Sequence, residues 1–142
     1  MAFKFSLESV LKVRKHEEKL QKQKLAEEMM KKKKIDQVKE DVKGRLETYL
    51  NGTNPDEAQN IQKIKRHGRH ILQTHELIQK LNNEAQVADK SVIEVREKLA
   101  MAHRNRHILD KLKEAEKKVF SRRLQQTEQK TMDEVANQSF SR

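Results

Sequence analysis

The stretch that decides the fold is residues 64–109, IKRHGRHILQTHELIQKLNNEAQVADKSVIEVREKLAMAHRNRHIL. Its apolar residues recur every seven positions in two interleaved sets, which are Ile64, Ile71, Ile78, Ala85, Val92 and Leu99, and then Leu81, Ala88, Val95, Ala102 and Leu109. Two such repeats form one narrow apolar seam along a helix, and a second helix has to cover it. The stretch therefore predicts a coiled coil.

The composition also favours long helices over a globular core. Of 142 residues, 38% are charged and 4% aromatic, and there are only three glycines and one proline. High charge also occurs in disordered chains, but the sustained heptads favour helix. The sequence has no cysteine, which excludes disulfides and thiolate chemistry. It has no apolar run near the roughly 20 residues that span a bilayer, so we expect a soluble intracellular protein.

One strong break interrupts the helical pattern, at residues 51–57 (NGTNPDE). Gly52 is expected to end the first helix in the left-handed conformation, and Asn54 and Pro55 are expected to start the second. Because the connection is short, the two helices should form an αα-hairpin. The prediction is an all-α fold with a single coiled-coil domain over residues 1–142, comprising helix 1 at about 5–50, a turn at 51–54 and helix 2 at about 55–137.

Antiparallel pairing about this turn predicts which residues face each other. Residue i should lie opposite about residue 105 − i, which brings Leu7 near Leu99 and ends the first helix near Arg104. The strict heptads stop at Leu109. About 30 residues are therefore expected to project as an overhanging C-terminal helix without cover.

The seam of the first helix is less regular. Its apolar face is formed by Leu7, Val10, Leu11, Leu25, Met29, Ile35, Val38, Val42, Leu46 and Tyr49. Between residues 14 and 24 the seam positions are polar, with Arg14, Glu18 and Lys22. Gly44 costs about 1 kcal/mol relative to alanine in a helix. We expect this glycine to permit a close approach of the two helices. The run Lys31–Lys34 is either an anion-binding patch or a solvated face whose stems cover the seam.

No motif of an enzyme is present, so we expect no catalytic, cofactor or metal site. The sequence lacks a glycine-rich phosphate loop, a nucleophile elbow and an HExxH motif. His103 and His107, and likewise His67 and His70, are spaced for chelation. A metal site needs three or four ligands, however, and arginines flank both pairs. Basic clusters would suit phosphates, but no stacking aromatic residue accompanies them.

Three groups of residues resemble the FliJ family of flagellar export proteins. The opening group is Phe5-x-Leu7-x-x-Val10-Leu11-x-Val13-Arg14, followed by Glu17, Glu18 and Leu25-Ala26. The second comprises Arg96-Glu97-x-Leu99-x-x-Ala102 and Lys111-Leu112-Lys113-Glu114, and the third is Met132-Asp133-Glu134-x-Ala136. Together they span nearly the whole chain. Stalk proteins of non-flagellar type III secretion are similar in shape, and the N-terminal motif favours the flagellar family.

The resemblance implies a stalk, because FliJ proteins are similar to the central stalk subunit of rotary ATP synthases. It implies that the end bearing the termini enters the ring of the flagellar ATPase FliI and promotes its assembly and activity. It also implies contact with the export-gate protein FlhA, assistance to export chaperones, and a part in bacterial motility. The expected location is cytoplasmic, peripheral at the cytoplasmic face of the inner membrane, with a monomer in isolation and no nucleic acid as partner.

Two surfaces are the candidates for these contacts. The ATPase-binding set is Leu7, Leu11, Arg14, Lys111, Leu112, Asp133 and Glu134, and the export-gate-binding set is Leu46, Tyr49, Leu50 and Leu72. Alternatively, the leucines of the first set only close the seam, and Tyr49 only packs against Ile61 or Ile64. Rival functions are a structural coiled-coil dimer with parallel helices and a basic nucleic-acid-binding coiled coil.

Overall fold

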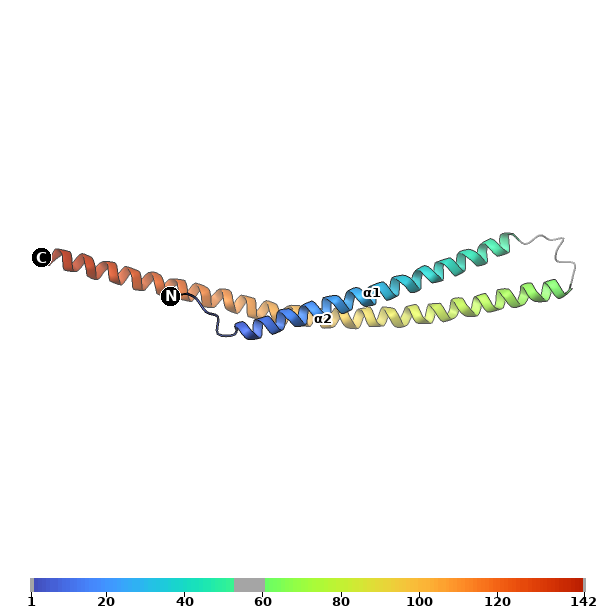
Figure 1. The fold of residues 1–142 in the computed structure, drawn as a ribbon, viewed down its shortest axis with the longest axis horizontal. Helices are drawn as coiled ribbons and strands as arrows, with labels where there is room; N and C mark the ends of the chain where they lie inside the picture. The colour runs from blue at the N-terminus through green and yellow to red at the C-terminus, as the bar shows by residue number, and fades with distance from the viewer. Residues whose placement is uncertain (1, 53–60, 142) are drawn as a thin grey trace. The chain divides into compact units, whose positions relative to one another are not determined.

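Two long helices make up nearly all of the computed structural model, which describes residues 2–52 and 61–141. Helix α1 runs from Glu8 to Asn51 and α2 from Ile61 to Phe140, and the described residues contain no strand. The chain divides into two compact units, unit 1 (residues 1–21 and 99–142) and unit 2 (residues 22–98). In each unit α1 packs antiparallel to α2 (Figure 1). The predicted all-α fold of two antiparallel helices is confirmed.

The end of α1 differs from the prediction. The backbone N–H of Gly52 donates to the carbonyl of Thr48 at 2.9 Å, which continues the hydrogen bonding of the helix. No described glycine has a positive φ, so the predicted left-handed cap at Gly52 is wrong. The predicted cap at Asn54 and helix start at Pro55 lie outside the described residues.

The seam of α2 continues beyond the apolar repeat. From His67 to Phe120, buried and half-buried residues alternate three and four positions apart, as the heptads predict. The apolar heptads end at Leu109 as expected, but the seam itself continues past them through Lys113 and Glu116 to Phe120, and Arg106 is a further charged residue at a seam position. Their side chains keep the spacing although they break the apolar pattern.

The seam of α1 follows the same spacing, from Leu11 through Arg14, Glu18 and Gln21 to Tyr49. Four apolar residues that were expected on this face are exposed instead: Leu7, Val10, Met29 and Val38. Val10, Met29 and Val38 each lie one position away from a seam residue and so fall on the flank of the helix, whereas Leu7 lies before α1 begins at Glu8. Lys22 is exposed too, and Gln21 takes the seam position beside it.

Ion pairs define which residues of the two helices are opposite each other. In unit 1, Lys113 Nζ lies 2.9 Å from Glu8 Oε2, and in unit 2 Lys32 pairs with Asp89. In both pairs the residue numbers add to 121, so residue i lies opposite about residue 121 − i. The predicted 105 − i is wrong by about two heptads. That prediction takes the turn at 51–54 as the centre of the pairing. In the structure, α2 starts to pack against α1 only near His67.

The cover of α2 ends at Phe120, whose ring packs on Phe3 with centroids 5.6 Å apart. Every described residue from 121 to 141 is exposed. An overhanging helix is therefore present in unit 1, but it starts at residue 121 and not after Leu109. Leu112, expected on the overhang, lies within the covered part.

The run Lys31–Lys34 is divided between the seam and the surface. Lys32 is at a seam position, and the Asp89 carboxylate beside it holds the pKa of its ammonium group above the usual value. Lys31 pairs with Glu28 at 3.5 Å, while Lys33 and Lys34 are exposed. Lys32 thus supports the interpretation in which lysine stems cover the seam.

Gly44 does not mark a close approach of the helices. A Cβ added there would meet no heavy atom within 4 Å, and the same holds for Gly68 in α2. The suggestion from the sequence is wrong, because Gly44 is on the exposed side of α1.

Gly44→Ala should therefore stabilise the protein. Alanine keeps the helix and restricts the unfolded chain, which favours the folded state by about 0.5–1 kcal/mol. Urea denaturation followed by circular dichroism would measure the gain, and Gly68→Ala should behave alike. A loss of stability in Gly44→Ala would instead support a packing role for this glycine.

Candidate functional site

The terminal surface is the name used here for Leu7, Leu11, Arg14, Lys111, Leu112, Asp133 and Glu134, all in unit 1. Its apolar members differ in accessibility. Leu11 is the one large side chain among the described residues that is fully buried, so it packs within the helix pair. Leu7, just before α1, and Leu112, on the flank of the seam, are exposed. Leu11 fits the alternative in which it closes the seam, and the other two leave apolar surface open to a partner.

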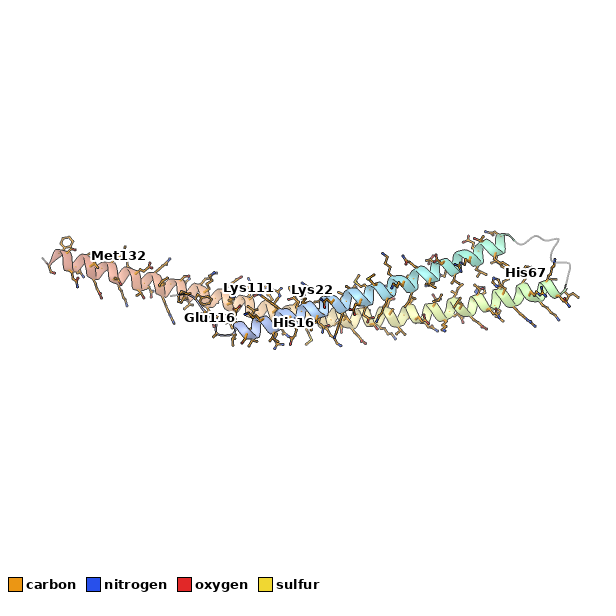
Figure 2. The ribbon with its side chains drawn as sticks, in the orientation of Figure 1. His16, Lys22, His67, Lys111, Glu116 and Met132 are labelled. Carbon is orange, nitrogen blue, oxygen red and sulfur yellow. The ribbon has the colours of Figure 1, made fainter. Side chains whose placement is uncertain are left out.

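Of the charged members of the terminal surface, Lys111, Asp133 and Glu134 are exposed and Arg14 is half-buried at a seam position. Arg14 Nη1 lies 3.1 Å from Glu17 Oε2, and Lys111 Nζ lies 3.6 Å from Glu114 Oε2. Asp133 accepts a hydrogen bond from Gln129 at 3.2 Å on the uncovered part of α2, where Met132 also lies (Figure 2). Ion pairs as exposed as these contribute little to stability. Their groups can therefore change partner at small cost.

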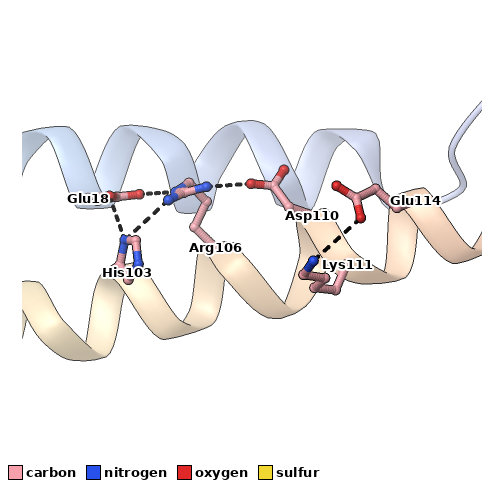
Figure 3. Close-up of polar contacts among 6 residues, drawn as sticks. All are labelled: Glu18, His103, Arg106, Asp110, Lys111 and Glu114. Carbon is pink, nitrogen blue, oxygen red and sulfur yellow. Dashed lines mark hydrogen bonds and ion pairs between the residues drawn. The ribbon is translucent and has the colours of Figure 1, made fainter.

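A polar network around the buried Glu18 joins the two helices of unit 1 beside the terminal surface (Figure 3). Glu18 is only 4% exposed, and its carboxylate accepts a hydrogen bond from Arg106 Nε. His103 Nδ1 lies 3.2 Å from the other Glu18 oxygen, and Arg106 Nη1 donates to Asp110. Glu18 and then Asp110 raise the pKa of the Arg106 guanidinium by these hydrogen bonds. Arg106 is thus held between two carboxylates.

Sequence reasoning placed Glu18 in the seam but missed its partners. The missed signal is the heptad position of Arg106, seven residues after Leu99. It also missed the aromatic contact of Phe3 with Phe120, and the burial of Phe5. A shallow groove runs beside that contact and is lined by Phe3, Lys4, Ala115, Glu116, Val119, Phe120 and Arg123.

The turn-end surface is the name used for Leu46, Tyr49, Leu50 and Leu72, all in unit 2. Leu46 is buried in the seam, whereas Leu50 is 48% and Leu72 60% exposed. The half-buried Tyr49 shares a hydrogen bond between its hydroxyl and His67 Nδ1, and its ring centroid lies 4.5 Å from that of His70. Tyr49 therefore packs on histidines. Ile61 and Ile64, the alternative packing partners of Tyr49, are 70% and 50% exposed.

The described histidines are not grouped with enough other side chains to bind a metal ion. The rings of His103 and His107 are stacked with centroids 6.1 Å apart. Within residues 2–52 and 61–141, no three His, Asp or Glu side chains are grouped to hold a metal ion. In the same part of the chain, neither helix has a stretch long and apolar enough to cross a membrane.

Comparison with known proteins gives one match. The family model described as "FliJ: Flagellar FliJ protein" matches residues 3–142, which is essentially the whole chain. No curated protein and no solved structure matches.

The Glu18–Arg106 pair predicts a non-additive pair of substitutions. Arg106→Leu should lower the melting temperature, because it removes the guanidinium that donates to the buried Glu18 carboxylate. The double variant Glu18→Leu, Arg106→Leu should regain most or all of the loss, since no buried charge remains. Thermal unfolding of the wild type, both single variants and the double variant measures this. A double variant whose loss of melting temperature equals that of a single variant, or the sum of both single variants, would contradict a direct pairing.

Proposed function

The chain belongs to the FliJ family of flagellar proteins, and from this premise we propose that it is a stalk for the export ATPase FliI. Family membership supports a non-enzymatic role associated with flagellar type III export. The finer proposal is that the terminal surface enters the FliI ring and promotes its assembly and activity. It includes contact of the turn-end surface with FlhA, assistance to export chaperones, and a cytoplasmic location at the inner membrane.

The observation that carries the ATPase contact is the uncovered end of α2. Its residues 121–140 are helical and exposed in unit 1, so a partner can surround them without separating the helix pair. The seam spacing continues there through Arg123, Thr127, Lys130, Glu134 and Asn137. These polar side chains do not require cover by a second helix. They favour contact with a polar ring interior over a coiled coil with another chain.

The covered part of the terminal surface also supports contact of this end of the protein with FliI. Arg14 comes from α1 and Lys111 from α2, and both are engaged only in exposed local ion pairs. Beside them, Leu7 and Leu112 supply accessible apolar area. Apolar contacts with a rim of charges are typical of a protein interface. The proposal treats the chain as a monomer in isolation, since α1 already covers the seam of α2.

The gate contact rests on the exposed leucines near the end of α1. Leu50 and Leu72 are on different helices of unit 2 and both are largely open to solvent. Tyr49, which directly precedes Leu50 in α1, is anchored by its contacts with His67 and His70 of α2. A half-buried ring that is already anchored suits docking into a pocket of a partner, because little side-chain freedom is lost on binding.

Charge reversal of the terminal surface tests the ATPase contact. Arg14→Glu combined with Lys111→Glu should raise the concentration needed for half-maximal stimulation of FliI by at least about tenfold, because like charges across an interface cost several kcal/mol. The measurement is ATP hydrolysis by FliI over a titration of the protein. A matched control reverses Lys33 and Lys34, which are exposed in unit 2. Unchanged stimulation by the first variant would refute the assignment.

Pull-down with the cytoplasmic domain of FlhA tests the gate contact. Leu50→Ala with Leu72→Ala should reduce retention several-fold, since both remove accessible apolar area without opening the seam. Tyr49→Ala should reduce it as well, whereas Tyr49→Phe keeps the ring and should retain binding. Val87→Ala with Ile93→Ala removes exposed apolar area elsewhere on α2 and serves as the control. Retention that is indifferent to Tyr49→Ala and to the leucine pair would count against this surface.

A further inference from the structure

The first turns of α2 carry a basic face that neither helix packing nor the proposed protein contacts use. Residues 58–75 are the longest run of the sequence without an acidic residue. Lys63, Lys65, Arg66 and Arg69 within it are all exposed. No ion pair joins any of these four to another described residue. Their charge is therefore available to an outside partner.

An apolar stripe lies next to this basic face. At about 100° per residue, Ile64, Ile61 and Leu72 fall within about 80° of the helix circumference. Ile61 is 70% and Ile64 50% exposed. Gly68 sits in the middle of the stripe, and open space surrounds its Cα. The stripe is thus a flat, accessible apolar band on the surface of unit 2.

The two faces are arranged side by side around the helix. Lys65, Arg69 and Arg66 follow the stripe in that order, over about the next 100° of the circumference. The seam positions His67 and Ile71 border the stripe on the side away from the basic residues, and Ile64, seven residues before Ile71, continues the seam. Because the cover by α1 begins only near His67, Ile61, Ile64 and the basic border are open together. The segment is therefore amphipathic and basic where the seam extends past its cover.

We propose that residues 61–72 of α2 bind the surface of an anionic lipid bilayer. Ile61 and Ile64 enter the boundary between headgroups and acyl chains, and Lys65, Arg66 and Arg69 pair with lipid phosphates. An apolar face bordered by lysine and arginine is the arrangement of helices that lie in a membrane interface. Nucleic acid would leave Ile61 and Ile64 in water, and the segment offers no aromatic residue for base stacking. Apart from Leu72, which the turn-end surface shares, this contact uses no residue assigned to FliI or FlhA, and it deepens the proposed location at the inner membrane.

Vesicle flotation tests the proposal with the full chain. The wild type should bind phosphatidylcholine vesicles that contain phosphatidylglycerol and should not bind phosphatidylcholine alone. Binding should weaken as salt rises, because the attraction is screened. Lys65→Glu, Arg66→Glu and Arg69→Glu together should lower the partition coefficient by more than about tenfold. Absence of binding to the anionic vesicles would overturn the proposal.

Matched variants separate a specific face from net charge. Lys33→Glu, Lys34→Glu and Lys43→Glu change the net charge equally at exposed positions of α1 and should keep most of the binding. Ile61→Ser with Ile64→Ser should reduce binding several-fold, whereas Val87→Ser with Ile93→Ser should not. Equal losses in the test and control variants would overturn the proposal, as would competition by inorganic phosphate.

Two further readouts separate lipid binding from unfolding of a variant and from binding to nucleic acid. Far-ultraviolet circular dichroism checks that each variant keeps its helices. A labelled DNA duplex should compete weakly, and stronger binding to DNA than to anionic vesicles would reassign the surface to nucleic acid. Stimulation of FliI should be unchanged in the Lys65, Arg66 and Arg69 variant. Failure of lipid binding is therefore separable from failure of the proposed stalk function.

Discussion

A buried carboxylate and its guanidinium partner decide how the two helices of unit 1 align. Glu18 is almost completely enclosed, and Arg106 is the cation that reaches it along the seam. A buried charge without a partner is strongly destabilising, so alignments that separate these two residues are disfavoured. The small seam residues of α2, such as Ala85 and Ala102, would tolerate a shift by one heptad far better. Specificity of alignment thus comes from charge, and cohesion from the apolar positions.

The sequence was sufficient for the class of fold but not for the alignment of the helices. The sevenfold repeat from Ile64 to Leu99 indicated a long helix with one seam, and the break near Gly52 indicated an antiparallel partner. Both inferences depend on local periodicity, which a single chain displays. Alignment depends on which charged residues meet across the seam. The prediction centred the pairing on the turn at 51–54, and without the pairs that Arg106 and Lys113 make it placed the end of the cover about two heptads too early.

The candidate surfaces show the same division between what a sequence displays and what only packing reveals. Leu11 and Leu7 are four residues apart, and both were expected on one face, yet one is enclosed and the other open. The identity of a leucine does not tell which of the two it is until the partner helix is aligned. The exposed charges of the terminal surface were easier to anticipate, because lysine and aspartate at such positions seldom become buried.

The uncovered end of α2 has a thermodynamic consequence for any partner that binds it. A single helix of this length has little intrinsic stability in water when nothing packs against it. Residues 121–140 should therefore lose helical turns from the C-terminus in a graded equilibrium, and a partner that recognises the helix must hold those turns in place. Part of its binding free energy is spent on this ordering. The helix propensity of exposed side chains such as Gln125 and Gln126 then contributes to the affinity, even where these side chains do not contact the partner.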